Sequence, residues 1–272
     1  MSAMDLSNLT YNTLNKMFVA GKRFDGRKLM EQREFSIEYD VSFKAEGSAR
    51  VRLGKTEVVV GVKMDVGEPY PDSMDKGNLM VSGDLLPLAS PRFESGPPKF
   101  NAIELPRLID RMVRESQVID LKKLVIKEGE KVWTVMIDIY PINDDGNLID
   151  AASIATMVAL MQTHIPALDK DSKVDHDAKG TKKLPLDDEI MPLSFTFYKL
   201  GESLIVDPTR EEEEACDGKI VFGLSNKGKE HMVHSCQKGL DIPLSGEEID
   251  TMMKTLPKLY DDTLKKLKKF LK

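Results

Sequence analysis

The alternation of apolar and polar residues between positions 34 and 66 predicts β-strands. In EFSIEYDVSFKAEGSARVRLGKTEVVVGVKMDV, valine, isoleucine and phenylalanine alternate with polar residues, and EGS and Gly54-Lys55 interrupt the pattern. Successive side chains of a strand point to opposite faces, so a period of two suits a half-buried sheet. We expect three strands joined by tight turns in this stretch.

Helical periodicity predicts four helices. Residues 6–21 have the pattern of an amphipathic helix that Gly21 ends, and we expect this helix to pack on the body of the protein. Residues 101–116 carry apolar side chains at spacings of three and four, which is typical of one helix face. Residues 150–168 are apolar on nearly every side, which predicts a buried helix, and a fourth helix begins at Ser245.

Two of these helices begin with the spacing of a capping box, in which an N-cap side chain and an acidic side chain three residues later bond each other's backbone N–H groups. Asn101 with Glu104 has this spacing, and so has Ser245 with Glu248. Pro106 removes an early helical hydrogen bond, so we expect the first of the two helices to begin a residue or two after Asn101.

Loops and polar stretches divide the chain. Residues 67–101 are rich in proline and glycine and predict long loops around one short strand. Residues 169–186 are polar and carry both charges without a period, which indicates a linker. On each side of this linker, predicted strands are followed by a predicted helix. This order predicts an α+β fold of two units, with sheets packed against helices. The expected organisation is an N-terminal helix (1–22), a first unit (23–168), the linker (169–186) and a second unit (187–272).

Composition narrows the classes of function. The 272 residues carry a net charge of −6, which argues against binding nucleic acid over the whole surface but leaves a local basic groove open. No apolar run approaches the length of a membrane span and no secretory signal is recognisable, so we expect a cytoplasmic protein without membrane partners. The two cysteines, Cys216 and Cys236, are expected to be reduced packing residues.

Three arginines form the best candidate binding site. Arg107, Arg111 and Arg114 stand at i, i+4 and i+7 of a predicted helix and therefore share a stripe. Guanidinium groups at this spacing can hold successive phosphates of a nucleic acid. The alternative is a solvated helix face on which Asp110 and Glu115 pair with these arginines.

Other clusters of polar residues give weaker signals. Glu211 to Glu214 and Asp217 follow a predicted strand, where carboxylates can hold a metal or transfer protons, or can form only a solvated turn. Gly146 precedes the buried helix, but its aspartate neighbours favour a turn and a helix cap over a phosphate site. His231 and His234 would face opposite sides of a strand, which disfavours a metal site.

Several motifs resemble the ribonuclease PH family. They are DGR at residues 25–27, AEGSARVRLGKTEVVVGV at 45–62, NAIELPRLIDRMVRES at 101–116 and WTVMIDIYPINDDGNLIDAASIATMVAL at 133–160. The resemblance runs from about Gly21 to the C-terminus. Within the family, PLASPRFESGPPKFNAIEL and VDPTREEEEACDGKI look most like the non-catalytic subunit of the archaeal exosome.

The resemblance implies a ribonuclease PH-like fold of two α+β units with mixed sheets, and departures from it imply a chain without catalytic residues of its own. Active members grip phosphate with a Gly-Thr-Arg or Gly-Ser-Arg turn, where this chain has Ile149 and Asp150. They also carry an aspartate that falls at Lys219 by an ungapped count, and only the preceding Asp217 is retained. The glutamates would then be what remains of an acidic turn, mostly in solvent.

The function implied by the resemblance is that of a ring subunit that supports phosphorolytic 3′-to-5′ RNA degradation. Its partners would be a catalytic ribonuclease PH-like sister in a hexameric ring, RNA-binding cap proteins and single-stranded RNA, which Arg107, Arg111 and Arg114 would contact. No cofactor or metal is expected in this chain. Inorganic phosphate is expected in the sister's active site, where a divalent metal stays an open question. The alternatives are an active homohexameric phosphate-dependent exoribonuclease and a ring scaffold without RNA contacts.

Overall fold

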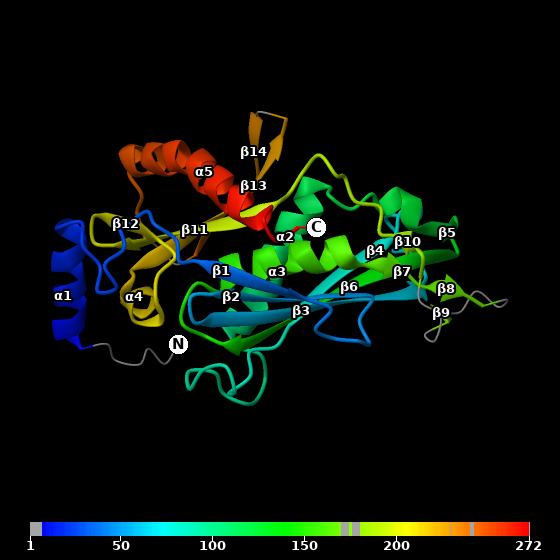
Figure 1. Ribbon diagram of the computed structural model, residues 1–272, viewed down its shortest axis with the longest axis horizontal. Coiled ribbons are helices and arrows are strands. Elements are labelled where there is room, and N and C mark those ends of the chain that lie inside the picture. Colours follow the sequence, from blue (N-terminus) through cyan, green and yellow to red (C-terminus); the bar gives the residue numbers. More distant parts are fainter. Residues whose placement is uncertain (1–6, 170–173, 176–179, 229, 240–241, 272) are drawn as a thin grey trace.

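The computed structural model describes residues 7–169, 174–175, 180–228, 230–239 and 242–271 (Figure 1). Its α-helices are α1 (Asn8–Val19), α2 (Phe100–Ser116), α3 (Leu148–Gln162), α4 (Arg210–Ala215) and α5 (Gly246–Leu267), and η1 (Leu121–Leu124) is a 3-10 helix. The strands of the two large sheets are β1 (Phe35–Tyr39), β2 (Gly47–Leu53), β3 (Thr56–Gly67), β4 (Asn78–Gly83), β5 (Val125–Lys127), β6 (Lys131–Asn143), β11 (Leu193–Leu200), β12 (Ser203–Val206), β13 (Gly218–Lys227) and β14 (Glu230–Gly239).

The first sheet is mixed. Its strand order is β1-β2-β3-β6-β4, with β5 also on β6, and β4 runs parallel to β6. The meander expected between residues 34 and 66 is confirmed as β1, β2 and β3. On β3, Val58, Val60, Val62 and Met64 are buried while the residues between them are partly exposed, as a strand with one covered face requires.

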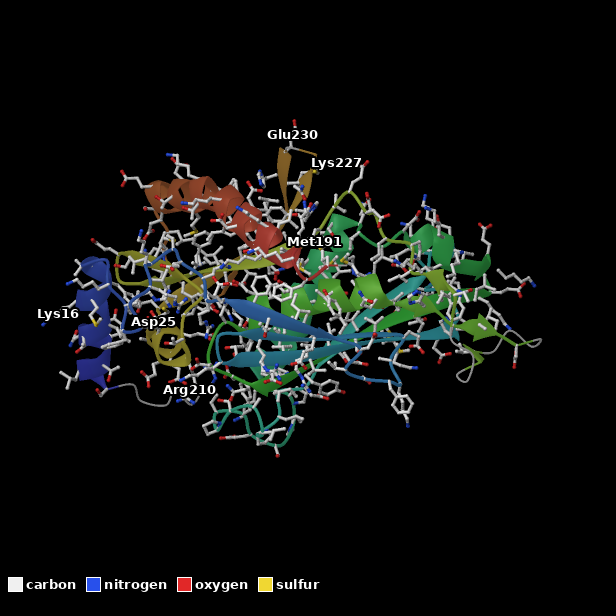
Figure 2. The ribbon with its side chains drawn as sticks, in the orientation of Figure 1. Lys16, Asp25, Met191, Arg210, Lys227 and Glu230 are labelled. Atoms are coloured by element: carbon white, nitrogen blue, oxygen red, sulfur yellow. The ribbon has the colours of Figure 1, made fainter. Side chains whose placement is uncertain are left out.

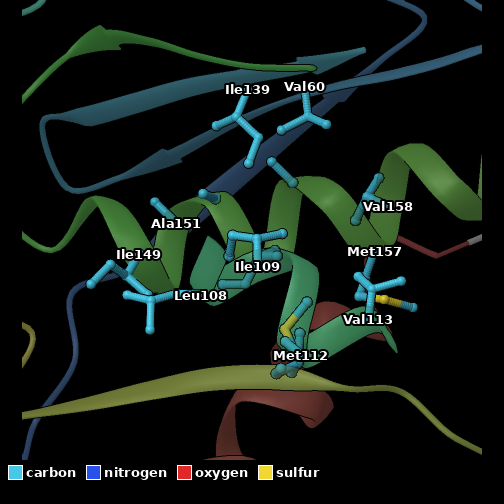
Figure 3. Close-up of a cluster of buried hydrophobic side chains, with 14 of the residues drawn as sticks. Val60, Leu108, Ile109, Met112, Val113, Ile139, Ile149, Ala151, Met157 and Val158 are labelled. Carbon is cyan, nitrogen blue, oxygen red and sulfur yellow. The ribbon is translucent and has the colours of Figure 1, made fainter. Parts of the chain in front are cut away.

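Helix α3 lies between the two sheets and explains why its sequence has no polar face. It packs against β2 and β3 on one side and against β11 and α2 on the other (Figure 1). Every residue from Leu148 to Leu160 is buried, which confirms the buried helix. The helix ends at Gln162, so its expected continuation over residues 163–168 is wrong. Figure 3 shows Val60 and Ile139 of the first sheet and Ile109 and Met112 of α2 around this helix.

The second sheet has the order β12-β11-β13-β14 and is antiparallel throughout, so the expectation of mixed sheets is wrong for this unit. Its middle strand β11 separates α3 from α5. Thr196 donates its hydroxyl to Asp150 of α3, whereas the neighbouring Phe195 packs its ring on the edge of Tyr260 in α5. Both faces of the strand are thus covered, because side chains alternate along it.

Helix α1 packs on the second unit, as expected for an N-terminal helix that joins the body. Leu14 and Phe18 form a small buried cluster with Tyr198 and Ile205, and Gly21 follows the helix at φ +68°. Figure 2 shows Lys16, Asp25 and Arg210 at this end of the molecule, with Lys227 and Glu230 at the tip of the β13–β14 hairpin.

The described parts of the predicted linker are attached to the first unit. β10 (Lys182–Lys183) pairs with β7 (His164–Ile165), and β9 (Val174–Asp175) pairs with β8 (Ala167–Leu168). Residues 170–173 and 176–179 of the linker lie outside the described residues. One buried apolar cluster runs through both units, and the proposed boundaries between them stay predictions.

Helix starts were predicted unevenly. The capping box of Ser245 and Glu248 is confirmed at the start of α5. The one at Asn101 and Glu104 is wrong, because the carbonyl of Lys99 accepts the first helical bonds and α2 begins ahead of Asn101. No described helix has the length and apolar character needed to cross a membrane.

Candidate nucleic-acid interface

Helix α2 has one face in the core and one in solvent. Leu108, Ile109 and Met112 are buried, and Figure 3 shows them beside α3. Exposed residues recur along the whole helix at spacings of three and four, so they share the opposite face. We call this face the α2 stripe; it consists of Phe100, Ile103, Arg107, Arg111 and Arg114.

The three arginines of the α2 stripe differ in their partners. Arg114 Nη2 lies 2.6 Å from Asp110 Oδ1 and also donates to the carbonyl oxygen of Leu79 at 3.0 Å. The hydrogen bonds that Arg114 donates to the Asp110 carboxylate raise the pKa of Arg114. Arg107 and Arg111 are exposed and form no ion pair with any side chain in the described part of the chain. The alternative in which acidic neighbours pair with the stripe therefore holds for Arg114 alone.

Lys219 anchors α2 rather than reaching a substrate. Its Nζ lies 2.7 Å from Glu104 Oε2, and both side chains are largely buried. This ion pair ties β13 to the helix one turn ahead of Arg107. The residue that stands where the resemblance places a catalytic aspartate is thus a cation engaged in a structural contact.

The start of α3 is closed by the chain itself. Gly146 has φ +84°, and a Cβ there would meet the carbonyl oxygen of Pro208 at 2.6 Å, so only glycine fits this turn. Glu213 Oε2 accepts a hydrogen bond from the backbone N–H of Asn147 at 2.9 Å. An N-terminal N–H group that could hold an anion is therefore already bound to a carboxylate of this protein.

Asp150 lies in the first turn of α3 and is buried. It accepts hydrogen bonds from Asn147 Nδ2 at 3.0 Å and from Thr196 Oγ1 at 2.7 Å. Burial raises its pKa to about 7, and the nearby charge of Asp207 acts in the same direction. A buried carboxyl group in this place offers phosphate no positive charge in either protonation state.

Asp207 is the centre of the buried charges. It is fully buried at φ +48° and receives the backbone N–H of Arg33 at 2.6 Å and Arg33 Nη2 at 2.7 Å. Arg27 Nη1 and Asn147 Nδ2 also donate to its carboxylate. Burial by itself would raise the pKa of Asp207, but the hydrogen bonds and charge of Arg33 outweigh it and lower the pKa. We call Arg33, Asn147, Asp150, Asp207 and Glu213 the α3 cluster.

The expectation that the glutamates lie mostly in solvent is wrong, as is the turn expected for them. Residues 210–215 form helix α4, which begins with a capping box between Thr209 and Glu212. Glu212 is buried and is held by two nitrogens of the buried Arg23. Glu213 and Glu214 are partly buried beside Arg92, and Glu211 is exposed. Arginines distant in sequence neutralise the acidic run, which the local sequence could not reveal.

Asp217 serves the structure of the hairpin. Its Oδ2 accepts the backbone N–H of Gly201 at 2.7 Å, and the hydroxyl of Tyr11 in α1 lies 3.3 Å from Oδ1. The retained acid is therefore bound to α1 and to the β11–β12 turn.

The remaining candidates do not converge on a site. His231 Nε2 lies 2.9 Å from Asp261, and His234 Nε2 lies 2.6 Å from the Ser225 hydroxyl, so the two histidines have different partners. No group of three potential metal ligands occurs among the described residues. Cys236 is exposed, which makes the expectation of a packing role wrong for it, because it lies on the edge strand β14.

Sequence reasoning missed the basic residues of the polar core. Arg23, Arg27, Arg33 and Arg92 hold the acids around α4 and α3. The only signal was an excess of arginines between residues 23 and 33, since their buried partners Asp207 and Glu212 lie more than 170 positions away.

Comparison with known proteins agrees with this geometry. Residues 31–166 match the 3′ exoribonuclease family, domain 1, and residues 191–255 match domain 2 of the same family. The exosome complex component Rrp42 of Methanothermobacter thermautotrophicus is 41% identical over 251 residues, which cover 92% of this chain and 91% of the relative. The Rrp42 of Archaeoglobus fulgidus is 46% identical over 88% of this chain and 90% of its own length.

Solved structures give the same result. A chain of the Archaeoglobus fulgidus exosome with RNA bound to the active site superposes with a TM-score of 0.85 at 41% identity, covering 97% of this chain and 98% of the other. A chain of an archaeal exosome core gives 0.83 at 38% identity, covering 96% and 97%. These matches extend over both units and confirm the ribonuclease PH-like fold. The chain belongs to the 3′ exoribonuclease family, which is the ribonuclease PH family, and its near relatives are exosome components.

Proposed function

We propose that this chain is a non-catalytic ring subunit of an archaeal exosome. It would bind RNA phosphates through Arg107, Arg111 and Arg114 and complete the active site of a catalytic ribonuclease PH-like sister, with RNA-binding cap proteins on the ring. The relatives named exosome complex component Rrp42 support this, as does the RNA-bound exosome among the similar structures. The contrast that carries the proposal is an open basic face on α2 beside a closed start of α3.

The closed start of α3 supports the absence of activity in the isolated chain. Phosphorolysis needs an anion site for inorganic phosphate and groups that stabilise charge as the bond breaks. Here Glu213 occupies the N–H of Asn147, and Asp150 lies buried behind it. Lys219 is engaged with Glu104. Inorganic phosphate would therefore bind in the sister's site and not in this chain.

The open face supports contact with the RNA backbone. Arg107 and Arg111 stand one helical turn apart, about 6 Å along the axis, and both residues are exposed. Each can donate to two phosphate oxygens, and such contacts do not depend on base sequence. Arg114 would contribute less, because Asp110 already binds it.

The test is phosphate-dependent degradation of a single-stranded RNA, first by the isolated chain and then by the chain assembled with its catalytic sister. We expect no nucleoside diphosphate release from the chain alone and release from the assembly. In the assembly, Arg107→Gln with Arg111→Gln should weaken RNA binding and reduce the slope of log affinity against log salt by about 1.4, since each phosphate contact on a single strand contributes about 0.7. Lys254→Gln with Lys258→Gln on α5 is the matched control, because it removes two exposed charges at the same spacing.

Two outcomes would contradict the proposal. Phosphate-dependent activity of the isolated chain would favour an active homohexameric exoribonuclease. Unchanged RNA affinity in an intact ring after the double arginine substitution would favour a scaffold without RNA contacts.

A further inference from the structure

The α2 stripe does not begin with arginines. Its first two members, Phe100 and Ile103, are 61% and 49% exposed, although the apolar face of α2 is buried. They precede Arg107 and Arg111 on the same face, at spacings of three, four and four. An exposed aromatic ring and an exposed aliphatic side chain thus continue the line of the guanidinium groups of Arg107 and Arg111.

A hollow opens at the same end of the helix. It has a volume of about 300 Å³ and is lined by Asp84 to Pro87, Arg92 to Lys99, and Asn101 with Ala102. Asn101 is exposed, and its side-chain amide forms no hydrogen bond with the described residues. The amide offers one acceptor and two donors at the edge of this hollow, which neither Phe100 nor Ile103 lines.

The chemistry of this end of the stripe fits a nucleobase better than a protein. Single-stranded nucleic acids bind where basic groups follow the backbone and aromatic rings stack on bases. The fully buried centre of a protein interface is depleted of charged residues, whereas Phe100 and Ile103 lead directly into two cations that form no ion pair within the described part of the chain. The charge of the stripe is complementary to a polyanion.

We infer that Phe100 and Ile103 form a stacking subsite for one base of single-stranded RNA. This inference rests on the proposed function, because Arg107 and Arg111 must hold the neighbouring phosphates. Phe100 lies about 10 Å along the helix axis from Arg107, so the stacked base belongs to the strand that the arginines bind. The subsite accepts any base, since every base has a π face.

The experiment measures equilibrium binding of a fluorescent single-stranded RNA to the assembled ring in phosphate-free buffer, so that the RNA stays intact. Phe100→Leu keeps an apolar side chain but removes the ring, and we expect it to weaken binding roughly 5- to 100-fold without changing the salt slope. Phe100→Trp keeps an aromatic side chain and should bind the RNA as tightly as the unchanged assembled ring does. Phe43→Leu is the matched control, because Phe43 is 94% exposed in the β1–β2 loop and is not a member of the stripe.

A second arm replaces single nucleotides of the RNA by abasic ones. When the abasic nucleotide stands at the stacked position, the unchanged ring should bind this RNA more weakly than intact RNA. The Phe100→Leu ring should bind both RNAs with the same affinity, because the RNA change and the protein change remove the same stacking contact. Equal affinities of the unchanged and Phe100→Leu rings for intact RNA would overturn the inference. If the double arginine substitution still weakens binding in that case, the proposed function stands. Loss of ring assembly in Phe100→Leu, seen by size-exclusion chromatography, would also overturn the inference and assign this end of α2 to a protein contact.

Discussion

The α3 cluster and the α2 stripe both contain arginines, but the arginine of the cluster is paired inside the fold and two arginines of the stripe are exposed. In the α3 cluster, Arg33 bonds the carboxylate of Asp207, and Glu213 caps the N–H of Asn147. In the α2 stripe, Arg107 and Arg111 have no such partners among the described residues. A polar group that is already paired inside the fold has little left for a ligand, so burial and pairing separate structural charges from binding charges.

The largest expected effect comes from breaking the buried charges around α4. Arg23→Ala leaves the carboxylate of Glu212 buried without its partner and should lower the free energy of unfolding by about 3–5 kcal/mol. Urea unfolding of the isolated chain measures this. The control is Arg210→Ala, whose side chain is 37% exposed and 3.8 Å from Glu214, and which should cost less than about 1 kcal/mol. Equal costs for the two would mean that the Arg23 pair is not structural.

The next effect is a pH dependence caused by Asp150. Its carboxyl group titrates near pH 4 when unfolded and, because of burial, near 7 when folded. Between these values the folded state holds one proton more, so stability should fall as pH rises from 4 to 7 and change little above 7. Asp150→Asn imitates the protonated form, because its NH₂ can donate to Thr196 and its oxygen can accept from Asn147.

Urea unfolding at pH 5, 6, 7 and 8 tests this prediction. At pH 8 the Asp150→Asn protein should be more stable than the unchanged protein by on the order of 2–4 kcal/mol, and its stability should vary less between pH 5 and 7. A parallel pH dependence of the two proteins would show that Asp150 is not the titrating group.

The tight turn at Gly146, which closes the start of α3, can also be tested by substitution. Gly146→Ala should cost about 2–4 kcal/mol, because a Cβ adds a clash with Pro208 to an unfavourable positive φ. Gly129→Ala has a similar φ of +72° but open space around it, so it should cost only about 1 kcal/mol. The difference in unfolding free energy between the variants isolates the clash, and its absence would mean that the turn can open.

The two regions also differ in what the sequence could predict. Periodicity located β1 to β3 and the buried helix α3, and the three arginines of α2 were visible because their spacing is local. The α3 cluster was not visible, because Arg33 and Asp207 are 174 positions apart and only the fold brings them together. For the same reason Glu212 was taken for a solvated residue, although Arg23 buries it from 189 positions away.

The smallest effect distinguishes the members of the α2 stripe. In the assembled ring, Arg107→Gln should weaken RNA binding by about 1 kcal/mol and reduce the salt slope by about 0.7. Arg114→Gln should do less, because Asp110 and the carbonyl of Leu79 already bind its guanidinium group. Asp110→Asn removes that competing carboxylate and should strengthen RNA binding slightly, an outcome that a merely structural Arg114 would not produce. A salt titration of all three variants checks the order, and an equal or larger effect of Arg114→Gln would mean that RNA displaces Asp110 from it.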